Sequence, residues 1–404
     1  MKPLAKAVLA AVLLFVPSAA SSACEFDNEV PVKSISAGFE AWKAVTAAMA
    51  ECGNFEAELD QEFRKKQPAA FAATPSLYQI GGVANSTIVP LLNEGTIRPL
   101  DDLVAKYGQN LTSNQLIKVD GQVMSIAMMV NAQHLMYRKD ILDDLGIAPP
   151  KSYDEMLAAA EKIKQAGVVD YPIGATMKTG WNVGMEFVNM FLGMGGEFFT
   201  DGVQPNVNNE TGIKALNMMK ALTEYMDPEF LVSDSTYVQQ QFQQNKIAMA
   251  NLWASRAGAM DDEAESQVVG KIEMAAAPAA VPGGKPATTI WWDGIVIAKN
   301  ISDEEADAAF RVAMEGLDSD MVQANSDIAV WLIKGYQPGR LAVGAIESLQ
   351  GGAPSFPAST AMGLMHTALG NNVADFLTGA KTAEQALADV EAEYTTSAKE
   401  TGLF

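Results

Sequence analysis

The chain has 404 residues, a formal net charge of -21, and only two histidines and two cysteines. Such an acidic surface repels phosphate backbones and anionic lipids, which argues against a nucleic-acid or membrane-surface partner. The sequence contains no HExxH, GxSxG, Walker or GxGxxG motif, so we expect no metal site, no cofactor and no activated nucleophile.

Residues 1–23 predict a secretory signal peptide. Lys2 and Lys6 precede an apolar stretch over 7–16, and small residues follow up to Ala23. Cleavage near Ala23 would leave the chain in the periplasm and change its net charge from -21 to -23, because two lysines are lost. No later segment approaches the roughly 18 consecutive apolar residues of a membrane-spanning helix, so we expect no membrane insertion of the mature chain.

The two cysteines of the exported chain predict a disulfide. Cleavage would leave Cys24 at the amino terminus, and Cys52 is its only possible partner within the chain. Closing this loop would stabilise the fold by about 3 to 4 kcal/mol on the chain-entropy model. The alternative is lipid attachment to Cys24, although the residues before it match a lipoprotein box poorly.

The remaining residues, about 380, exceed one hydrophobic core and predict two domains. Strand-like and helical segments alternate, which is typical of an α/β architecture with mostly parallel sheets. The carboxyl ends of such strands line a crevice where ligands bind. Phe39 and Glu40 follow the first strand and Gln79 ends the third, so we expect all three at that crevice. The first expected strands are 30–36, 55–59 and 77–80, and the first expected helices are 41–50 and 87–93.

Two later segments carry clear local signals. Residues 118–122 form a hairpin turn signal and precede an apolar run that Asn131 interrupts, with a further strand over 134–138. Ser152 is placed to cap a helix that carries Glu155 three residues on and that stops at Gly167.

The run Trp291, Trp292, Asp293 and Gly294 opens an apolar strand. Side chains alternate along a strand, so one indole and Asp293 point away from the other indole. An indole face beside a carboxylate acceptor suits a sugar, whose C–H patches stack while its hydroxyls donate. The alternative is a packing strand whose tryptophans belong to the core.

Five segments, in this order along the chain, resemble bacterial extracellular solute-binding proteins of family 1. The first reads NAQHLMYRKDILDDLG and the second PPKSYDEML, where the family has a strand, a "YNKDLF" segment and a "T(W/Y)DEL" helix. The others resemble its "WA" turn, its strand before an "eaA" helix and its closing helical motif. The segments are 131–146, 149–157, 247–254, 295–306 and 376–387.

The resemblance implies an α/β, two-lobed periplasmic binding protein fold of type II, in which hinge-connected lobes hold the ligand in a cleft between them. Transferred by position, the first lobe comprises residues 24–130 plus 296–345. The second lobe comprises residues 131–295 plus 346–404.

The implied function is non-enzymatic capture of a carbohydrate, either a sugar (mono- or oligosaccharide) or a related polyol. The protein would act as a monomer and deliver its ligand to the permease of an inner-membrane ABC importer. Two alternatives stay open. One is a secreted hydrolase with paired carboxylates, and the other is the same fold binding a polyamine or other cationic solute, which the acidic composition would suit.

The resemblance also implies site residues. Trp253 matches the aromatic of the "WA" turn that stacks on a sugar ring, Asn131 sits on a hinge strand, and Trp181 falls where the family places cleft residues. The family usually has small residues where Trp291 to Asp293 stand, which points to selectivity particular to this chain. Arg340 lies near the second hinge crossing and could meet an acidic sugar, with a surface salt bridge as the alternative.

Overall fold

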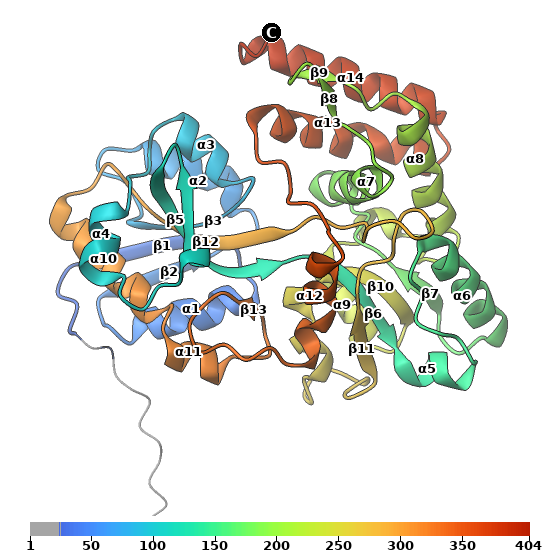
Figure 1. Ribbon diagram of the computed structural model, residues 1–404, viewed down its shortest axis with the longest axis horizontal. Helices are drawn as coiled ribbons and strands as arrows, with labels where there is room; N and C mark the ends of the chain where they lie inside the picture. Colours follow the sequence, from blue (N-terminus) through green and yellow to red (C-terminus); the bar gives the residue numbers. More distant parts are fainter. Residues whose placement is uncertain (1–23, 25) are drawn as a thin grey trace, which may run out of the picture.

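The computed structural model describes residue 24 and residues 26–404. It consists of two α/β lobes side by side, each built around its own sheet (Figure 1). The predicted two-lobed α/β fold is confirmed.

The first lobe contains a seven-stranded sheet in the order β13-β5-β12-β3-β1-β2, with β4 paired to β5. Its strands are β1 (Val32–Ser36), β2 (Phe55–Leu59), β3 (Ile80–Ala84), β4 (Leu116–Val119), β5 (Gln122–Asn131), β12 (Trp291–Ile297) and β13 (Val330–Trp331). Its helices are α1 (Glu40–Ala50), α2 (Phe63–Ala72), α3 (Ile88–Asn93), α4 (Asp101–Tyr107), α10 (Asp303–Glu315) and α11 (Ser319–Ala324), with the 3-10 turn η1 (Ser113–Gln115).

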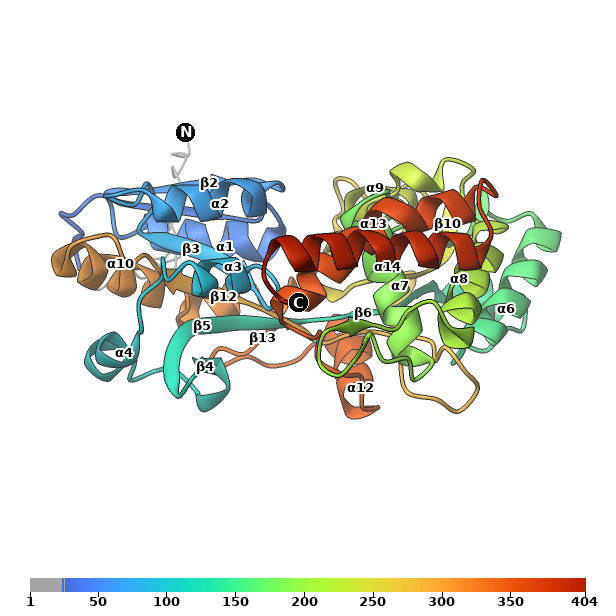
Figure 2. The same cartoon turned by 90° about the horizontal axis from the view of Figure 1, so that it is seen from above.

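The second lobe contains a four-stranded sheet in the order β11-β6-β10-β7, and α13 lies along α14 beside it (Figure 2). Its strands are β6 (Gln133–Arg138), β7 (Tyr171–Gly174), β10 (Ile247–Trp253) and β11 (Ile272–Ala275), with the hairpin β8 (Phe199–Thr200) and β9 (Gln204–Pro205). Its helices are α5 (Lys139–Asp144), α6 (Tyr153–Ala166), α7 (Trp181–Gly193), α8 (Glu210–Thr223), α9 (Ser235–Gln243), α12 (Val343–Gln350), α13 (Thr360–Leu377) and α14 (Ala383–Glu400). The 3-10 turns are η2 (Phe230–Val232), η3 (Ala254–Arg256), η4 (Gly258–Asp261) and η5 (Arg340–Ala342).

The prediction of mostly parallel sheets is wrong. β1 runs parallel to β2 and β3, and β7 runs parallel to β10, but the other strand pairs are antiparallel. The physical reason lies in the long strands that connect the lobes. The chain leaves the first lobe along β5 and returns along β12, so these two paired strands run in opposite directions.

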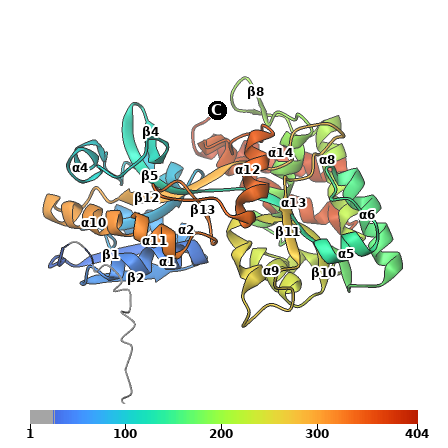
Figure 3. The ribbon, with the colours of Figure 1, turned by 60° about the horizontal axis from the view of Figure 1, so that its bottom comes forward.

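Three chain passages connect the lobes. β5 continues into β6 through Ala132, β12 begins at Trp291 opposite Asn131, and a third passage follows β13. Leu341 already belongs to a core cluster of the second lobe, and α12 packs on β11 and β6 (Figure 3). We therefore keep the predicted lobe division as a proposal with two changes. The first lobe takes in β12 from Trp291 instead of from residue 296, and the third passage ends before Leu341 instead of at residue 345.

Local signals predicted several elements well. The 118–122 turn is a tight hairpin in which Asp120 and Gly121 have φ of 50° and 83°, as a primed turn requires. The Ser152 side chain accepts the amide of Glu155 at the start of α6, which ends at the left-handed Gly167. The third strand is displaced, because β3 covers Ile80–Ala84 instead of residues 77–80.

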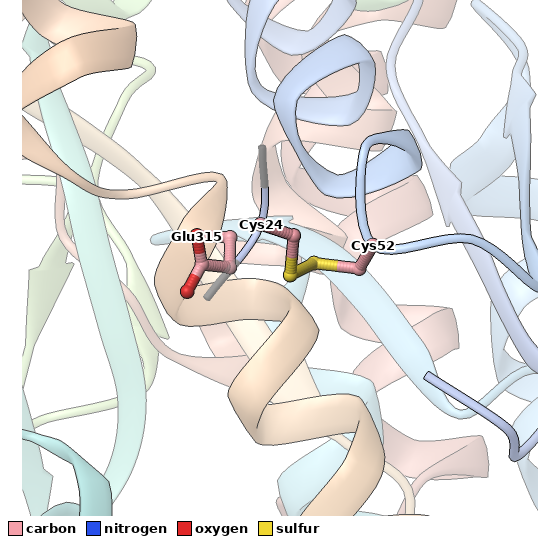
Figure 4. A group of neighbouring side chains, drawn as sticks. All are labelled: Cys24, Cys52 and Glu315. Atoms are coloured by element: carbon pink, nitrogen blue, oxygen red, sulfur yellow. A yellow bond between two sulfur atoms is a disulfide. The ribbon is translucent and has the colours of Figure 1, made fainter. Parts of the chain in front are cut away.

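The predicted disulfide between Cys24 and Cys52 is confirmed, with 4.9 Å between the two Cα atoms. It ties the first described residue to the turn after α1, beside Glu315 at the end of α10 (Figure 4). Because both sulfurs are bonded to each other, this group offers no thiolate to a metal. The predicted signal peptide and its cleavage position lie outside the described residues. Within the described residues, no helix is long and apolar enough to cross a membrane.

Candidate ligand-binding site

A cavity of ≈ 220 Å³ lies between the two lobes, next to the crossing strands. The first lobe lines it with residues that follow β1 and β3 and with the start of α2. The second lobe contributes the starts of α7 and α9 and the turn after β10. The lining side chains that carry rings, charges or amides are Phe39, Gln61, Glu62, Phe63, Arg64, Asn131, Lys178, Trp181, Asn182, Asp234, Trp253, Arg256, Trp291 and Asp293.

Side-chain alternation along β12 separates the two adjacent tryptophans. Trp291 and Asp293 line the cavity, whereas Trp292 packs against the core of the first lobe. Asn85 holds the strand in this position, because its side chain accepts the amide of Trp292 at 2.9 Å and donates to the carbonyl of Ile290 at 3.2 Å. The period-two argument therefore placed Trp291 and Asp293 on the same face, as the structure has them.

Three indoles form one wall of the cavity. The ring centroids of Trp181 and Trp253 lie 6.2 Å apart, and each lies within 6 Å of Trp291, at 5.8 and 5.9 Å. Phe356 backs Trp291 at 4.3 Å, outside the cavity lining. Trp253 and Trp291 are buried and Trp181 is half-buried, so the wall is rigid and apolar.

A buried chain of hydrogen bonds fixes the orientation of Trp291. Its indole N–H donates to the Thr289 hydroxyl at 2.9 Å, and that hydroxyl donates to the Asn189 side chain at 2.9 Å. Asn189 donates to Gln133 at 2.7 Å, and Gln133 donates to the Glu186 carboxyl at 2.8 Å. Burial raises the pKa of Glu186 to about 7. The chain joins β6, α7 and the loop before β12 behind the aromatic wall.

Asn131 connects the hinge to the second lobe. Its side chain donates to the Ser255 hydroxyl at 3.2 Å and accepts the Ser255 amide at 3.3 Å. The pair lies where β5 leads into β6, and both residues belong to the lining of the cavity. Each keeps further hydrogen-bonding capacity for a ligand hydroxyl.

Arg64 and Asp293 both line the first-lobe side of the cavity and interact electrostatically. The guanidinium carbon of Arg64 lies 5.1 Å from the ring centroid of Trp181, over its face. Burial raises the pKa of Asp293 to about 7, while the charge of Arg64 opposes this shift. Asp293 is therefore a carboxyl that can accept or donate a hydrogen bond near neutral pH.

The second-lobe side carries Lys178, Asp234 and Arg256. Asp234 caps α9 by accepting the amides of Thr236 and Tyr237 at 3.1 and 3.0 Å, and it pairs with Lys178 at 3.1 Å. Arg256 donates to the side chain of Gln239 at 3.2 Å.

Of the ten residues expected at the ligand, the structure brings six to the cavity: Trp253, Trp291, Asp293, Trp181, Asn131 and Phe39. The other four lie elsewhere. Trp292 packs on the first-lobe core, and the exposed Glu40 pairs with Lys43 at 2.6 Å. Arg340 forms a salt bridge with Asp261 and donates to the carbonyl of Ile272 at 2.7 Å.

The expectation that Gln79 lies at the crevice is wrong. It precedes β3 instead of ending a strand, and it therefore lies at the end of the sheet away from the cavity. There its side chain accepts the amide of Lys33 at 2.8 Å and donates to Glu305 at 3.3 Å.

Sequence reasoning missed most of the charged lining. Glu62 and Arg64 belong to the start of α2, and Asp234 caps α9; neither helix was predicted. The signal for α9 was present, since Asp234 is a favourable N-cap residue. Arg256 lies three residues after Trp253 in the "WA" turn, so the resemblance could have indicated it. No local signal marks Arg64, because its place in the cavity depends on how the lobes meet.

Comparison with known proteins agrees with this architecture. The family model of bacterial extracellular solute-binding proteins matches residues 40–314. A probable ABC transporter-binding protein of Deinococcus radiodurans is 28% identical over 286 residues, which are 67% of this chain and 66% of the relative. An sn-glycerol-3-phosphate-binding periplasmic protein of Rhizobium meliloti is 30% identical over 125 residues, 28% of this chain and 27% of the relative. The matched part of the chain thus spans about two thirds of the length of the first relative and about a quarter of the length of the second.

A solved structure of similar fold is the ABC transporter solute-binding protein of Agrobacterium radiobacter in complex with ribitol. The two chains superpose with a TM-score of 0.82 at 21% sequence identity, covering 91% of this chain and 99% of the other. The family match covers more than half of the chain and confirms the resemblance found in the sequence. The protein belongs to the bacterial extracellular solute-binding proteins, a family that binds solutes and is not enzymatic.

Proposed function

We propose that this protein captures a sugar or a related polyol in the cavity between its lobes and hands it to an ABC importer. The observation that carries the proposal is the wall of Trp181, Trp253 and Trp291 beside hydrogen-bonding side chains in one cavity. The complex of the Agrobacterium relative with ribitol supports a polyhydroxylated ligand.

The wall and the polar side chains would divide the recognition between them. A sugar ring would stack its C–H face on an indole, and its hydroxyls would bond to Asn131, Asn182 and Asp293. Sugars that lack one of these hydroxyls would leave a buried polar group unpaired, which costs about 1 to 3 kcal/mol. Ligand contacts with both lobes would favour the closed arrangement.

The two alternatives find less support in the cavity. A hydrolase needs two carboxyl groups free for acid and base work, but Asp234 is bound to Lys178 and caps α9, and Glu62 pairs with Lys65 at 2.5 Å. A polyamine would meet Arg64 and Arg256, so the acidic composition of the chain does not extend to its cavity.

The remaining parts of the account are proposals as well. Export would place the mature chain in the periplasm after cleavage near Ala23. There it would act as a monomer and deliver its ligand to the permease of an inner-membrane importer. The name of the Deinococcus relative, a probable ABC transporter-binding protein, supports the ABC transporter as partner.

Thermal unfolding with a panel of sugars, polyols, amino acids and polyamines tests the proposed function. At a hundred times its dissociation constant, a true ligand should stabilise the fold by about 2.7 kcal/mol. A shift with a sugar or polyol that stays intact on prolonged incubation supports the proposal. A shift with polyamines alone, or turnover of the sugar, contradicts it.

A further inference from the structure

We propose that the ligand carries an anionic group, a carboxylate or a phosphate, on its polyhydroxylated body, and that Arg256 binds this group with Arg64 as the second cation. This inference rests on the proposed function, because it concerns the ligand of the same cavity. It follows from the pairing of charged side chains, from the helices that begin at the cavity, and from the contrast with the rest of the surface.

The charges in the cavity are unevenly paired. Within the part of the chain that the structure describes, neither Arg64 nor Arg256 has a carboxylate oxygen within 4.0 Å. Arg64 rests on an indole face, and Arg256 reaches only the neutral Gln239. The carboxylates beside them are engaged, since Glu62 pairs with Lys65 and Asp234 with Lys178.

Asp293 does not offset both cations. It is a single carboxyl, and burial holds part of its population in the neutral form near pH 7 by raising its pKa to about 7. Burial also lowers the pKa of Arg64 and Arg256, yet a guanidinium stays charged in a protein. Arg64 is exposed and Arg256 is half-buried, so both can reach a ligand, and two cations without a bonded anion favour an anion supplied by that ligand.

Four helices begin at this cavity and point their positive ends at it. The lining includes Phe39 and Glu62, which precede α1 and α2, together with Trp181 at the start of α7 and Asp234 before α9. Only α9 among them has a side-chain cap, and α1 carries Glu40 in its first turn. The first turns of α2 and α7 contain no acidic residue, so their amides add positive potential. Together with the planar guanidinium of Arg256, which can donate two parallel hydrogen bonds, these helix ends resemble an anion-binding site.

The rest of the molecule makes the contrast sharper. The whole chain carries 28 lysines and arginines against 49 aspartates and glutamates, whereas the charged residues of the cavity lining are three cations and three carboxyls. Arg340, which the sequence suggested for an acidic sugar, forms a salt bridge and lies outside the cavity. In this proposal Arg256, not Arg340, is the arginine that binds the acidic group of the ligand.

Matched neutral and anionic ligands test the proposal by titration calorimetry at low and at moderate ionic strength. Galactose is compared with galacturonate, glucose with glucuronate, and glycerol with sn-glycerol 3-phosphate. We expect at least one acidic member to bind about ten times more tightly than its neutral partner, with an affinity that falls as salt is added. Tighter binding of a sugar acid would identify the anionic group as a carboxylate, and tighter binding of sn-glycerol 3-phosphate would identify it as a phosphate.

Variants then assign the cation. Arg256→Gln should weaken the preferred acidic ligand about ten- to a hundredfold, Arg64→Gln less, and Arg256→Lys should restore part of the loss. The neutral partner should change by less than about threefold. The matched control is Arg340→Gln, which removes the same charge outside the cavity and should leave the affinity unchanged. Circular dichroism and thermal unfolding of each apo variant confirm that it folds.

The outcomes are distinct. Neutral members that bind as tightly as acidic ones overturn the anion proposal and leave the proposed function standing. An acidic preference that survives in both Arg256→Gln and Arg64→Gln overturns the assignment of the cations. If no member of any pair binds, and the wider panel of sugars and polyols also gives no shift, both proposals fail.

Discussion

At the residue scale, the short run from Trp291 to Asp293 shows how a strand places adjacent side chains in different environments. Alternation sends one indole into the core of the first lobe and places the other, with Asp293, at the cavity. The sequence predicted that the two indoles lie on opposite faces of the strand, but not which of them faces the cavity. The choice depends on the pairing of β12 with β3 and β5, which only the folded sheet determines.

The cavity tryptophans differ in burial, and this predicts two phenotypes. Trp253 is 8% exposed and belongs to the second-lobe core, whereas Trp181 is half-buried. Trp253→Ala should lower the unfolding free energy by about 3 kcal/mol and abolish sugar binding. Trp181→Ala should weaken binding at least tenfold while lowering stability by about 1 kcal/mol. Urea unfolding and calorimetric titration of both variants check this, and equal losses of stability would be inconsistent with it.

Asp293 should make stability depend on pH. Because burial raises its pKa from 3.8 to about 7, the folded protein holds the proton more tightly than the unfolded chain does. Its contribution to stability is therefore greatest below about pH 4 and declines as the pH rises to about 7. Asp293→Asn resembles the protonated form, so it should stabilise the apo protein at pH 8, by on the order of 1 kcal/mol, and have little effect at pH 4.

Urea unfolding of the wild type and Asp293→Asn between pH 4 and 8 measures the effect. Part of the wild-type slope should persist in the variant, because burial raises the pKa of Glu186 to about 7 as well. An Asp293→Asn variant that is destabilised at pH 8 would show that the ionised carboxylate is held favourably in the fold.

At the scale of elements, local chemistry predicted those segments whose signals are local. The hairpin at Asp120 and Gly121 needed only its turn residues, and α6 needed only Ser152 and Gly167. α2 was missed because Pro68 and a run of charged residues disguise its apolar face, although Phe63 and Phe71 are buried. Because Arg64 lies on α2 and Asp234 caps α9, missing these helices also meant missing two charged residues of the site.

The hydrogen-bond chain behind Trp291 gives a prediction about how elements support the wall. Thr289→Val keeps the side-chain volume but removes the hydroxyl that links the indole N–H to Asn189. Leaving these buried groups unpaired should lower the unfolding free energy by about 1 to 3 kcal/mol. Affinity should fall severalfold because the ring is less firmly held. Thermal unfolding and titration of Thr289→Val, with Thr289→Ser as the conservative comparison, check it; a neutral Thr289→Val would show that packing alone orients Trp291.

At the scale of the molecule, side-chain contacts connect the two lobes in addition to the three chain passages. The side chain of Asn93 on α3 donates to the hydroxyl of Thr360 on α13 at 2.8 Å, and Arg64 on α2 lies over Trp181 on α7. Both contacts bridge the lobes, and Arg64 and Trp181 also line the cavity. A ligand held by residues of both lobes would shift the population toward this arrangement. Family resemblance predicted the two lobes from motif order, whereas the charge of the cavity emerged only from their assembly.

Titration calorimetry of the wild type, Trp291→Phe and Trp292→Phe with the tightest-binding sugar or polyol tests the central claim most directly. The two variants change adjacent residues in the same way, but only Trp291 lines the cavity. We predict that Trp291→Phe weakens binding at least about tenfold, because it removes stacking area and the bond to Thr289, while Trp292→Phe changes the affinity by less than about twofold. Equal affinities of the two variants, or a larger loss in Trp292→Phe, would place the ligand away from this wall and contradict the account.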